Sequence, residues 1–429
     1  MSSLNAGEPI GNKNPAASSG APGLLRSLTL THAILYGLGV TIGAGVYVLV
    51  GVAAGRSGMH APLAFIGAAL VMALSAASFA ELGTRMPVSA SEAAYVQAAF
   101  RRKRVSLLVG LLVVVTAMIS AATISVGSAG YIGVFLDIPG KLIIAGVVIS
   151  MGALACLATV QSVTFAAVMT VIETGGLLLI IVAGVASGPE VVNRIPELLP
   201  PIGDLSIWVG LSGTMLIAVF AYTGFEHLVN IAEELKEPSK TLPRALFATL
   251  AVTAAIYGAV VWIAVVTVPP DELARSQAPL AMVFERLTGM PLLVMSLVAI
   301  VATLNGIIVH MIMIARVLYG LASQGNLPAV LGRLHPTTRT PVLATLIGIG
   351  VILILALLVP IAGLADFTAR FTLVIFAIVN LSLISIKSQE ANPPTGIFIC
   401  PGWVPIAGLA SSLSLLALDI ATTTDLLRL

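Results

Sequence analysis

Long apolar stretches recur along the whole chain and constrain its fold more than any other feature. A helix needs about 20 mainly apolar residues to cross the hydrocarbon core of a bilayer. About eleven stretches meet this length, at 30–54, 61–83, 105–135, 141–160, 164–187, 206–231, 244–268, 291–322, 341–360, 363–386 and 403–420. Only 9% of the 429 residues are charged, against about 25% in a soluble domain. Because no stretch shows the alternating pattern of a transmembrane β-strand, we predict an all-α integral membrane protein.

The placement of lysine and arginine predicts the orientation of these spans. Cytoplasmic loops of membrane proteins carry an excess of both residues. With a cytoplasmic N-terminus, fourteen of the 21 Lys and Arg residues fall in inside loops, six fall outside, and Arg370 falls within a span. We therefore expect a multi-pass protein of the plasma membrane (the inner membrane, if the cell is bacterial) with its N-terminus in the cytoplasm. An odd number of spans then places the C-terminus outside.

Two of the apolar stretches are interrupted, and they stand five spans apart. The first, 31–54, contains four glycines between positions 37 and 45, and glycine inside a helix costs about 1 kcal/mol relative to alanine. The sixth, 207–231, is interrupted at Phe220–Phe225. Interrupted segments at corresponding positions of two halves point to the binding site of a transporter. Because five is odd, the second half must insert upside down, which predicts a 5+5 inverted-repeat transporter fold with broken helices 1 and 6.

The same pattern divides the chain into four parts. Residues 1–28 are rich in small and polar residues and are expected to form a flexible cytoplasmic tail. Residues 29–187 and 188–386 are expected to form the two five-helix repeats, with the proline-rich loop Gly188–Ser206 between their helices. Residues 387–429 are expected to add an accessory C-terminal helix and tail.

The two breaks offer complementary chemistry. A break at membrane depth is tolerated where the backbone is buried in protein or lines a cavity. The half-helix that starts near Gly43–Gly45 presents free N–H groups, which favour an anion such as a carboxylate. The half-helix that ends near Phe220–Tyr222 presents free carbonyl groups, which favour a cation such as an ammonium group. An amino acid zwitterion carries both groups, whereas the alternative is that the glycines only allow close helix packing.

Four segments carry motifs of defined order and spacing. They are IGAGVY at Ile42–Tyr47, AELGTRMPVSASEAAYVQAAF at Ala80–Phe100, FAYTGFEHLVNIAEELKEPSKTLPRAL at Phe220–Leu246, and ARVLYGLASQGNLPAVLGRLHPTTRTP at Ala315–Pro341. These motifs resemble signatures of the amino acid–polyamine–organocation (APC) superfamily, and the resemblance covers roughly residues 30–420. It implies a secondary transporter of amino acids that works by alternating access and needs no bound cofactor.

The resemblance also implies which residues contact the substrate. The predicted set is Thr41, Ile42, Gly43, Ala44 and Gly45 in the first break, and Phe220, Ala221, Tyr222 and Thr223 in the second. Ile42–Gly45 match backbone that binds the substrate carboxylate, and Thr41 lies beside them. Phe220 matches an aromatic gate over the substrate. The three residues after it match the unwound segment that meets the amine and the side chain.

The chain also departs from the family pattern. Ala90 and Ser91 replace the paired glycines of the second motif. Family members usually have twelve helices or more, against about eleven here. In many relatives the fifth helix carries a lysine, where a sodium ion sits in sodium-coupled cousins, and this position is Glu173 here.

Two glutamates inside spans are candidates for proton coupling, because a charge near the bilayer centre costs several kcal/mol and is a functional candidate by default. Glu173 could exchange a proton or help to hold a cation; the alternative is a permanently protonated side chain that bonds to a neighbouring helix. Thr303 and Asn305 could face the same site if the fifth and eighth spans are neighbours, as the resemblance implies. For Glu226, bracing of the unwound segment is favoured over proton movement.

Other polar residues of the spans have structural interpretations. Glu81 and Arg85 stand four residues apart and are expected to form an ion pair. Asp366 and Arg370 have the same spacing and are also expected to pair, with a gating role left open. His310 is expected to be hydrogen-bonded packing rather than a proton relay.

The predicted function is secondary active transport of amino acids. No acidic side chain lies in segments 41–47 and 220–224, which favours neutral amino acids, while Glu173 favours proton symport over exchange without proton coupling. A channel would need a selectivity filter or charged pore rings, and a transport-dead sensor stays open. Scattered histidines and the lack of nucleotide, zinc or nucleophile motifs argue against an enzyme. The expected partners are an amino acid, protons and lipids, with no cofactor, no metal and no nucleic acid.

Overall fold

The computed structural model describes residues 26–43, 45–87, 91–157, 163–323, 325–390, 392 and 394–423. The predicted flexible tail, residues 1–28, lies outside the described residues except for its last three, and Ala44 of the first break lies outside them too. Within the described part, all the secondary-structure elements are helices. In addition, Leu28 and Leu235 form an isolated β-bridge.

The helices follow the apolar stretches of the sequence. In chain order they are α1 (Leu30–Ile42), α2 (Gly45–Ser57), η1 (Gly58–His60), α3 (Ala61–Arg85), α4 (Ser91–Phe100), α5 (Lys103–Ile132), α6 (Gly140–Leu157), α7 (Val163–Ala186), α8 (Glu190–Asn193), η2 (Ile195–Leu198), α9 (Leu205–Tyr222), η3 (Phe225–Glu234), α10 (Pro238–Thr267), α11 (Pro270–Arg275), α12 (Pro279–Thr288), α13 (Leu292–Ser323), η4 (Ala329–Gly332), α14 (Val342–Leu358), α15 (Ile361–Gln389) and α16 (Trp403–Thr423). Here η marks a 3₁₀ helix. Proline at the first turn suits a helix start, as at the beginning of α10.

Nine helical runs in the described residues are long and apolar enough to cross a membrane, and α1 and α14 are shorter apolar helices. One of the nine, Gly45–Arg85, joins α2 to α3. Each of the eleven predicted stretches contains a helix, or the two halves of a broken one. The chain is therefore a multi-pass all-α membrane protein, as predicted.

Both predicted breaks are present. The first helix ends at Ile42 and resumes at Gly45. The sixth ends at Tyr222 and continues after Gly224 as η3, a 3₁₀ helix of ten residues. A 3₁₀ segment of this length is unusual and often marks a hinge. The broken-helix prediction is thus confirmed, whereas the assignment of 29–187 and 188–386 to two repeats stays a prediction.

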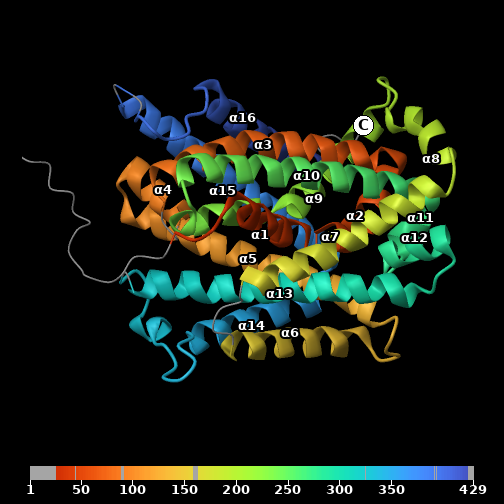
Figure 1. Ribbon diagram of the computed structural model, residues 1–429, viewed down its shortest axis with the longest axis horizontal. Coiled ribbons are helices and arrows are strands. Elements are labelled where there is room, and N and C mark those ends of the chain that lie inside the picture. Colours follow the sequence, from red (N-terminus) through yellow and green to blue (C-terminus); the bar gives the residue numbers. More distant parts are fainter. Residues whose placement is uncertain are drawn as a thin grey trace, which may run out of the picture.

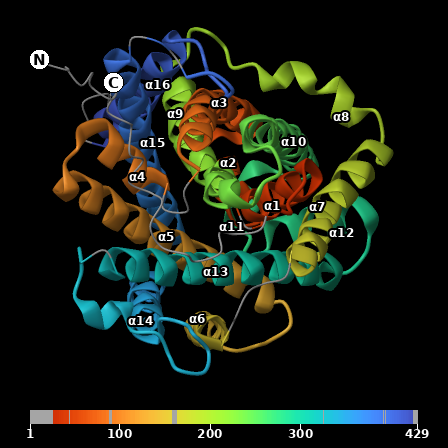
Figure 2. The ribbon, with the colours of Figure 1, turned by 60° about the vertical axis from the view of Figure 1, so that its left-hand side comes forward.

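The helices pack as two groups (Figure 2). In one group α1, α2, α9, α3 and α10 contact one another. In the other group α5, α6, α13 and α14 do so. Helix α7 joins α1 to α13 on one flank, and α15 joins α9 to α5 on the other. The long helices run roughly parallel to the long axis of the molecule (Figure 1).

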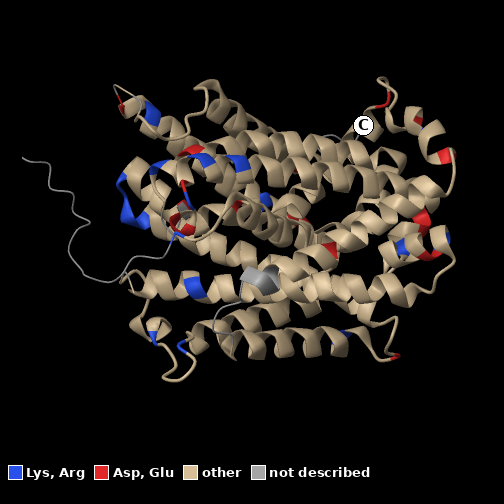
Figure 3. Ribbon diagram, viewed as in Figure 1, with Lys and Arg blue, Asp and Glu red and all other residues tan. Residues whose placement is uncertain are grey.

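Charged residues gather at the two ends of this axis and are sparse between them (Figure 3). Blue residues, Lys and Arg, are dense at the end that carries α4 (Figure 3). This distribution is the one expected when the middle of the molecule lies in the hydrocarbon core. Which end faces the cytoplasm stays a prediction from the lysine and arginine count.

Candidate site between the two broken helices

A tyrosine from α10 joins the two breaks. The hydroxyl oxygen of Tyr257 lies 2.8 Å from the carbonyl oxygen of Thr41 and 3.2 Å from that of Ala221. The hydroxyl has one proton to donate, so the two carbonyls share it. Tyr257 is fully buried, and the orphan carbonyls of both half-helices find a partner at the same atom. The sequence did not point to this residue, because a tyrosine within an apolar span is typical of the buried core.

Two glycines allow the breaks to approach each other. A Cβ atom on Gly45 would lie 2.5 Å from Cα of Ala221, closer than any real Cβ contact. Gly224 has φ +124°, and a Cβ there would lie 2.7 Å from the carbonyl oxygen of Val40. Close packing, the alternative reading of the glycines, therefore does apply to Gly45. It also brings the two breaks into backbone contact.

Most of the predicted substrate residues face one small cavity. Thr41, Gly45, Phe220, Ala221 and Thr223 all line it, and its volume is about 20 Å³. One water molecule needs about 10–15 Å³ of such space, so the cavity has room for one water molecule but not for an amino acid. The structure shows this site closed.

The remaining predicted residues lie elsewhere. Ile42 is fully buried, and Gly43 faces α7. Tyr222 points away from the small cavity into an aromatic cluster, where its ring centroid lies 6.4 Å from that of Phe65 and 5.3 Å from that of Tyr257. Its hydroxyl has no hydrogen-bond partner among the described residues.

Glu173 of α7 lies behind the first break and is fully buried. Its Oε1 accepts a hydrogen bond of 2.9 Å from the side-chain amide of Asn305 on α13. Its Oε2 has no hydrogen-bond partner among the described residues and lies 3.4 Å from where a Cβ on Gly43 would be. The expected approach of Asn305 is thus present, whereas Thr303 bonds instead to Ser128 of α5 at 3.0 Å.

A chain of tyrosine hydroxyls fixes the backbone around Glu173. Tyr47 on α2 donates to the carbonyl oxygen of Glu173 at 2.7 Å. Tyr131 on α5 donates to the carbonyl oxygen of Tyr47 at 2.6 Å. These bonds connect the half-helix α2 to α7 and α5, so the backbone at Glu173 is tied through α2 to both helix groups.

Side chains in the second break satisfy its own backbone. The Glu226 carboxylate accepts a hydrogen bond of 2.8 Å from the backbone N–H of Gly224. Thr223 donates its hydroxyl to the carbonyl oxygen of Phe220 at 2.7 Å. The contact expected of a bracing glutamate is present. His310 bonds through Nδ1 to the carbonyl oxygen of Gly306 at 2.8 Å, so the expected hydrogen bond of this histidine is present as well.

An ion pair between α2 and α15 corrects the sequence prediction for Asp366. Asp366 on α15 pairs with Arg56 of α2 through two bonds of 3.0 and 2.9 Å, not with Arg370. Arg56 also donates to the carbonyl oxygen of Gly213 on α9 at 3.2 Å. Arg370 pairs with Asp419 of α16 at 2.6 and 3.0 Å. Asp366 and Arg370 are neighbours on one helix, but each turns to a charge on a different neighbouring helix.

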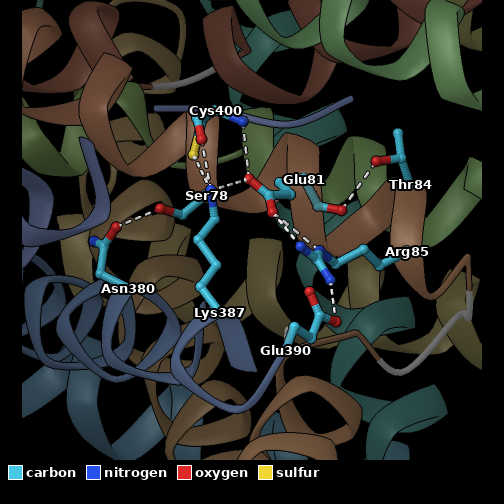
Figure 4. Close-up of polar contacts among 8 residues, drawn as sticks. All are labelled: Ser78, Glu81, Thr84, Arg85, Asn380, Lys387, Glu390 and Cys400. Carbon is cyan, nitrogen blue, oxygen red and sulfur yellow. Dashed lines mark hydrogen bonds and ion pairs between the residues drawn. The ribbon is translucent and has the colours of Figure 1, made fainter. Parts of the chain in front are cut away.

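A denser network ties the C-terminal end of α3 to α15 (Figure 4). The predicted pair of Glu81 and Arg85 is present at 2.6 Å. The buried Glu81 carboxylate also accepts from Lys387 at 2.8 Å and from the backbone N–H of Cys400 at 2.8 Å (Figure 4). Burial and the nearby Glu81 raise the pKa of the Cys400 thiol to about 12, so this thiol stays protonated at neutral pH. Among the described residues, no group of three His, Cys, Asp or Glu is placed to hold a metal ion.

Comparisons with known proteins identify the family of the chain. A family model described as "Amino acid permease" matches residues 28–423. The chain is 28% identical over 420 residues to the branched-chain amino acid permease BcaP of Bacillus subtilis, covering 92% of this chain and 88% of that protein. It is 27% identical to an uncharacterized transporter of Mycobacterium tuberculosis, covering 93% of this chain and 90% of that protein. It is also 27% identical to the cationic amino acid transporter 4 of Mus musculus, covering 88% of this chain and 62% of that protein.

Proposed function

The chain belongs to the amino acid permease family and is not an enzyme, and from this premise we propose that it carries neutral amino acids by binding them between its two broken helices. The observation that carries the proposal is the meeting of the breaks at Tyr257. This meeting places the N-terminus of α2 beside the C-terminus of α9. The positive end of one helix dipole suits the carboxylate, and the negative end of the other suits the ammonium group.

Binding an amino acid in this place requires the small cavity to open. Phe220 lines that cavity and is 3% exposed, which is consistent with an aromatic gate over the substrate. Helices α2 and α9 are held to α15 by the bonds of Arg56. Alternating access is then a movement of one helix group, α1, α2, α9, α3 and α10, against the other, α5, α6, α13 and α14. The Arg56 bonds break when the cavity opens toward the end of the molecule where Arg56 lies.

A neutral aliphatic side chain fits the lining of the small cavity. Its described lining includes Phe220, Ile124 and Val40 and contains no carboxylate. A cationic amino acid would bury an unpaired charge there, which is costly. The relative from Bacillus subtilis bears the name of a branched-chain permease, whereas the mouse relative is named for cationic amino acids, so both classes are worth testing.

Uptake into proteoliposomes tests this function. The purified protein is expected to take up L-leucine in a saturable way, with D-leucine and L-arginine as poor competitors. Preferred uptake of L-arginine would contradict the neutral class but keep the carrier. Flux that does not saturate would support a channel, and binding without any flux would support a sensor.

Glu173 is the residue that we propose couples transport to protons. It is fully buried, and only one of its oxygens has a partner among the described residues. A carboxyl group in this setting can bind a proton when its environment changes between two states of the transporter. Amino acid exchange without protons is the alternative coupling.

Glu173→Gln separates these two modes. The amide keeps an oxygen that can accept from Asn305, but it cannot release a proton. We expect the variant to exchange labelled L-leucine across vesicles at equal pH and to lose accumulation driven by a pH gradient. Continued accumulation under the gradient would show that Glu173 is not the coupling residue.

A further inference from the structure

A second cavity lies beside the closed site, next to η3. Its volume is about 40 Å³, which is room for a few water molecules. Thr223 and His310 line both cavities. The second cavity therefore continues from the second break toward α4, whose Glu92 also lines it.

Four titratable side chains line this cavity. They are Glu92 of α4, Glu226 and His227 of η3, and His310 of α13. The imidazole rings of His227 and His310 lie 6.4 Å apart between centroids. Helices α5 and α15 add the hydroxyl groups of Thr116, Ser120 and Thr372, and no Lys or Arg is among the described residues that line the cavity. Every titratable group facing this space is thus a carboxyl or an imidazole.

The hydrogen bond of His310 sets which of its nitrogens can take up a proton. Nδ1 bonds to the carbonyl oxygen of Gly306, and a carbonyl only accepts, so Nδ1 carries the hydrogen of the neutral ring. Nε2 is then the basic nitrogen. A proton gained at Nε2 makes the ring cationic, and its transfer to the Glu226 carboxylate leaves a neutral ring and a neutral carboxylic acid.

The same turn of α13 reaches the buried glutamate of α7. Asn305 donates to Glu173, and the next residue, Gly306, accepts from His310. The hydrogen bond to Glu173 and the hydrogen bond that orients the His310 ring therefore involve adjacent residues of α13.

The size and the chemistry of the cavity together indicate its occupant. The space is too small for an amino acid and large enough for water, and its lining can both give and accept protons. Waters that bridge such groups conduct protons in membrane proteins. We propose that this cavity is a proton-transfer site, in which water links His310 to Glu226 and passes protons between the substrate site and the α4 end of the molecule. The proposal deepens the proton coupling proposed above and rests on it.

Infrared spectroscopy tests whether these groups form one proton site, and it needs no substrate. The protein in lipid nanodiscs is titrated from acid to alkaline pH, and the carboxylic acid band of Glu226 is identified by its loss in Glu226→Gln. That variant keeps an amide oxygen to accept from Gly224. We expect His310→Gln to move the midpoint of the Glu226 titration by about one pH unit, as for coupled sites.

A histidine outside the cavity supplies the matched control. His335→Gln changes an exposed loop residue and is expected to leave the midpoint in place. An unchanged Glu226 midpoint in His310→Gln, in protein that elutes as folded wild type does, would overturn the proposal. His310→Asn provides a second variant if the first does not fold.

Transport assays then distinguish a failure of the proton-transfer proposal from a failure of the proposed transport function. In proteoliposomes, the loss caused by His310→Gln is expected to be at least about tenfold larger for pH-driven accumulation than for L-leucine exchange at equal pH. Accumulation at the wild-type level would overturn the proton-transfer role. Wild-type vesicles that move no amino acid would contradict the proposed function, and the infrared coupling would then decide the proton site alone.

Discussion

Tyr257 is the residue at which the two broken helices meet, and the site depends on its hydroxyl group. A buried carbonyl without a partner costs about 1–3 kcal/mol, whereas a satisfied hydrogen bond contributes about 1 kcal/mol. The hydroxyl satisfies carbonyls of both breaks, Thr41 and Ala221, at once. It therefore holds the two half-helices in register without adding a charge to the site.

Tyr257→Phe removes only this hydroxyl and keeps the ring against Phe65. We expect the variant to lose about 1–3 kcal/mol of stability, seen as a lower melting temperature of the purified protein. We also expect a lower maximal rate of L-leucine uptake. The control is Tyr319→Phe on α13, near the C-terminal end of that helix; equal effects from both changes would contradict the role of Tyr257.

Among elements, the half-helices α2 and α9 depend on backbone contact rather than on side chains. Gly45 faces Ala221 where a Cβ has no room. Backbone cannot move aside as a flexible side chain can, so overpacking at this point costs about 1–3 kcal/mol and pushes the breaks apart.

Gly45→Ala is therefore expected to abolish L-leucine uptake while the protein still inserts into membranes. Gly146→Ala is the matched control, because a Cβ at Gly146 of α6 meets nothing within 4 Å. That control should transport as wild type does and gain up to about 1 kcal/mol from helix propensity. Normal uptake by Gly45→Ala would show that the half-helices do not need this contact.

The elements also show how far the sequence could predict the fold. Span positions and both breaks followed from apolar length and glycine content, because these are local properties. The partners of Asp366 and Arg370 did not, since Arg56 and Asp419 lie far away in the chain and only packing brings them close. Tyr257 and its two carbonyl partners were missed for the same reason. The cavity beside η3 could not be predicted at all, because it is formed by five separate elements.

At the scale of the whole molecule, α15 carries charges that face two different neighbours. Asp366 binds Arg56 of α2, in the helix group that contains the breaks. Arg370 binds Asp419 of α16, which lies outside that group. Breaking the first pair should free α2 and α9, whereas breaking the second should not.

Asp366→Asn is expected to open the small cavity more often. The measurement is the rate at which a thiol reagent labels Ile124→Cys, a cavity-lining position that is 2% exposed, in purified protein with Cys156 and Cys400 replaced by Ala. Asp419→Asn is the matched control and should leave the labelling rate unchanged. Equal acceleration by both variants would mean that loosening α15, rather than releasing α2, exposes the cavity.

The central claim is that an amino acid binds between the two breaks, and a structure of the protein with bound L-leucine tests it most directly. The account predicts that the carboxylate lies at the N-terminus of α2, the ammonium group lies at the carbonyl groups that end α9, and Phe220 covers the ligand. L-leucine bound elsewhere, for example in the cavity lined by Glu226 and His310, with the two breaks still in contact, would contradict it.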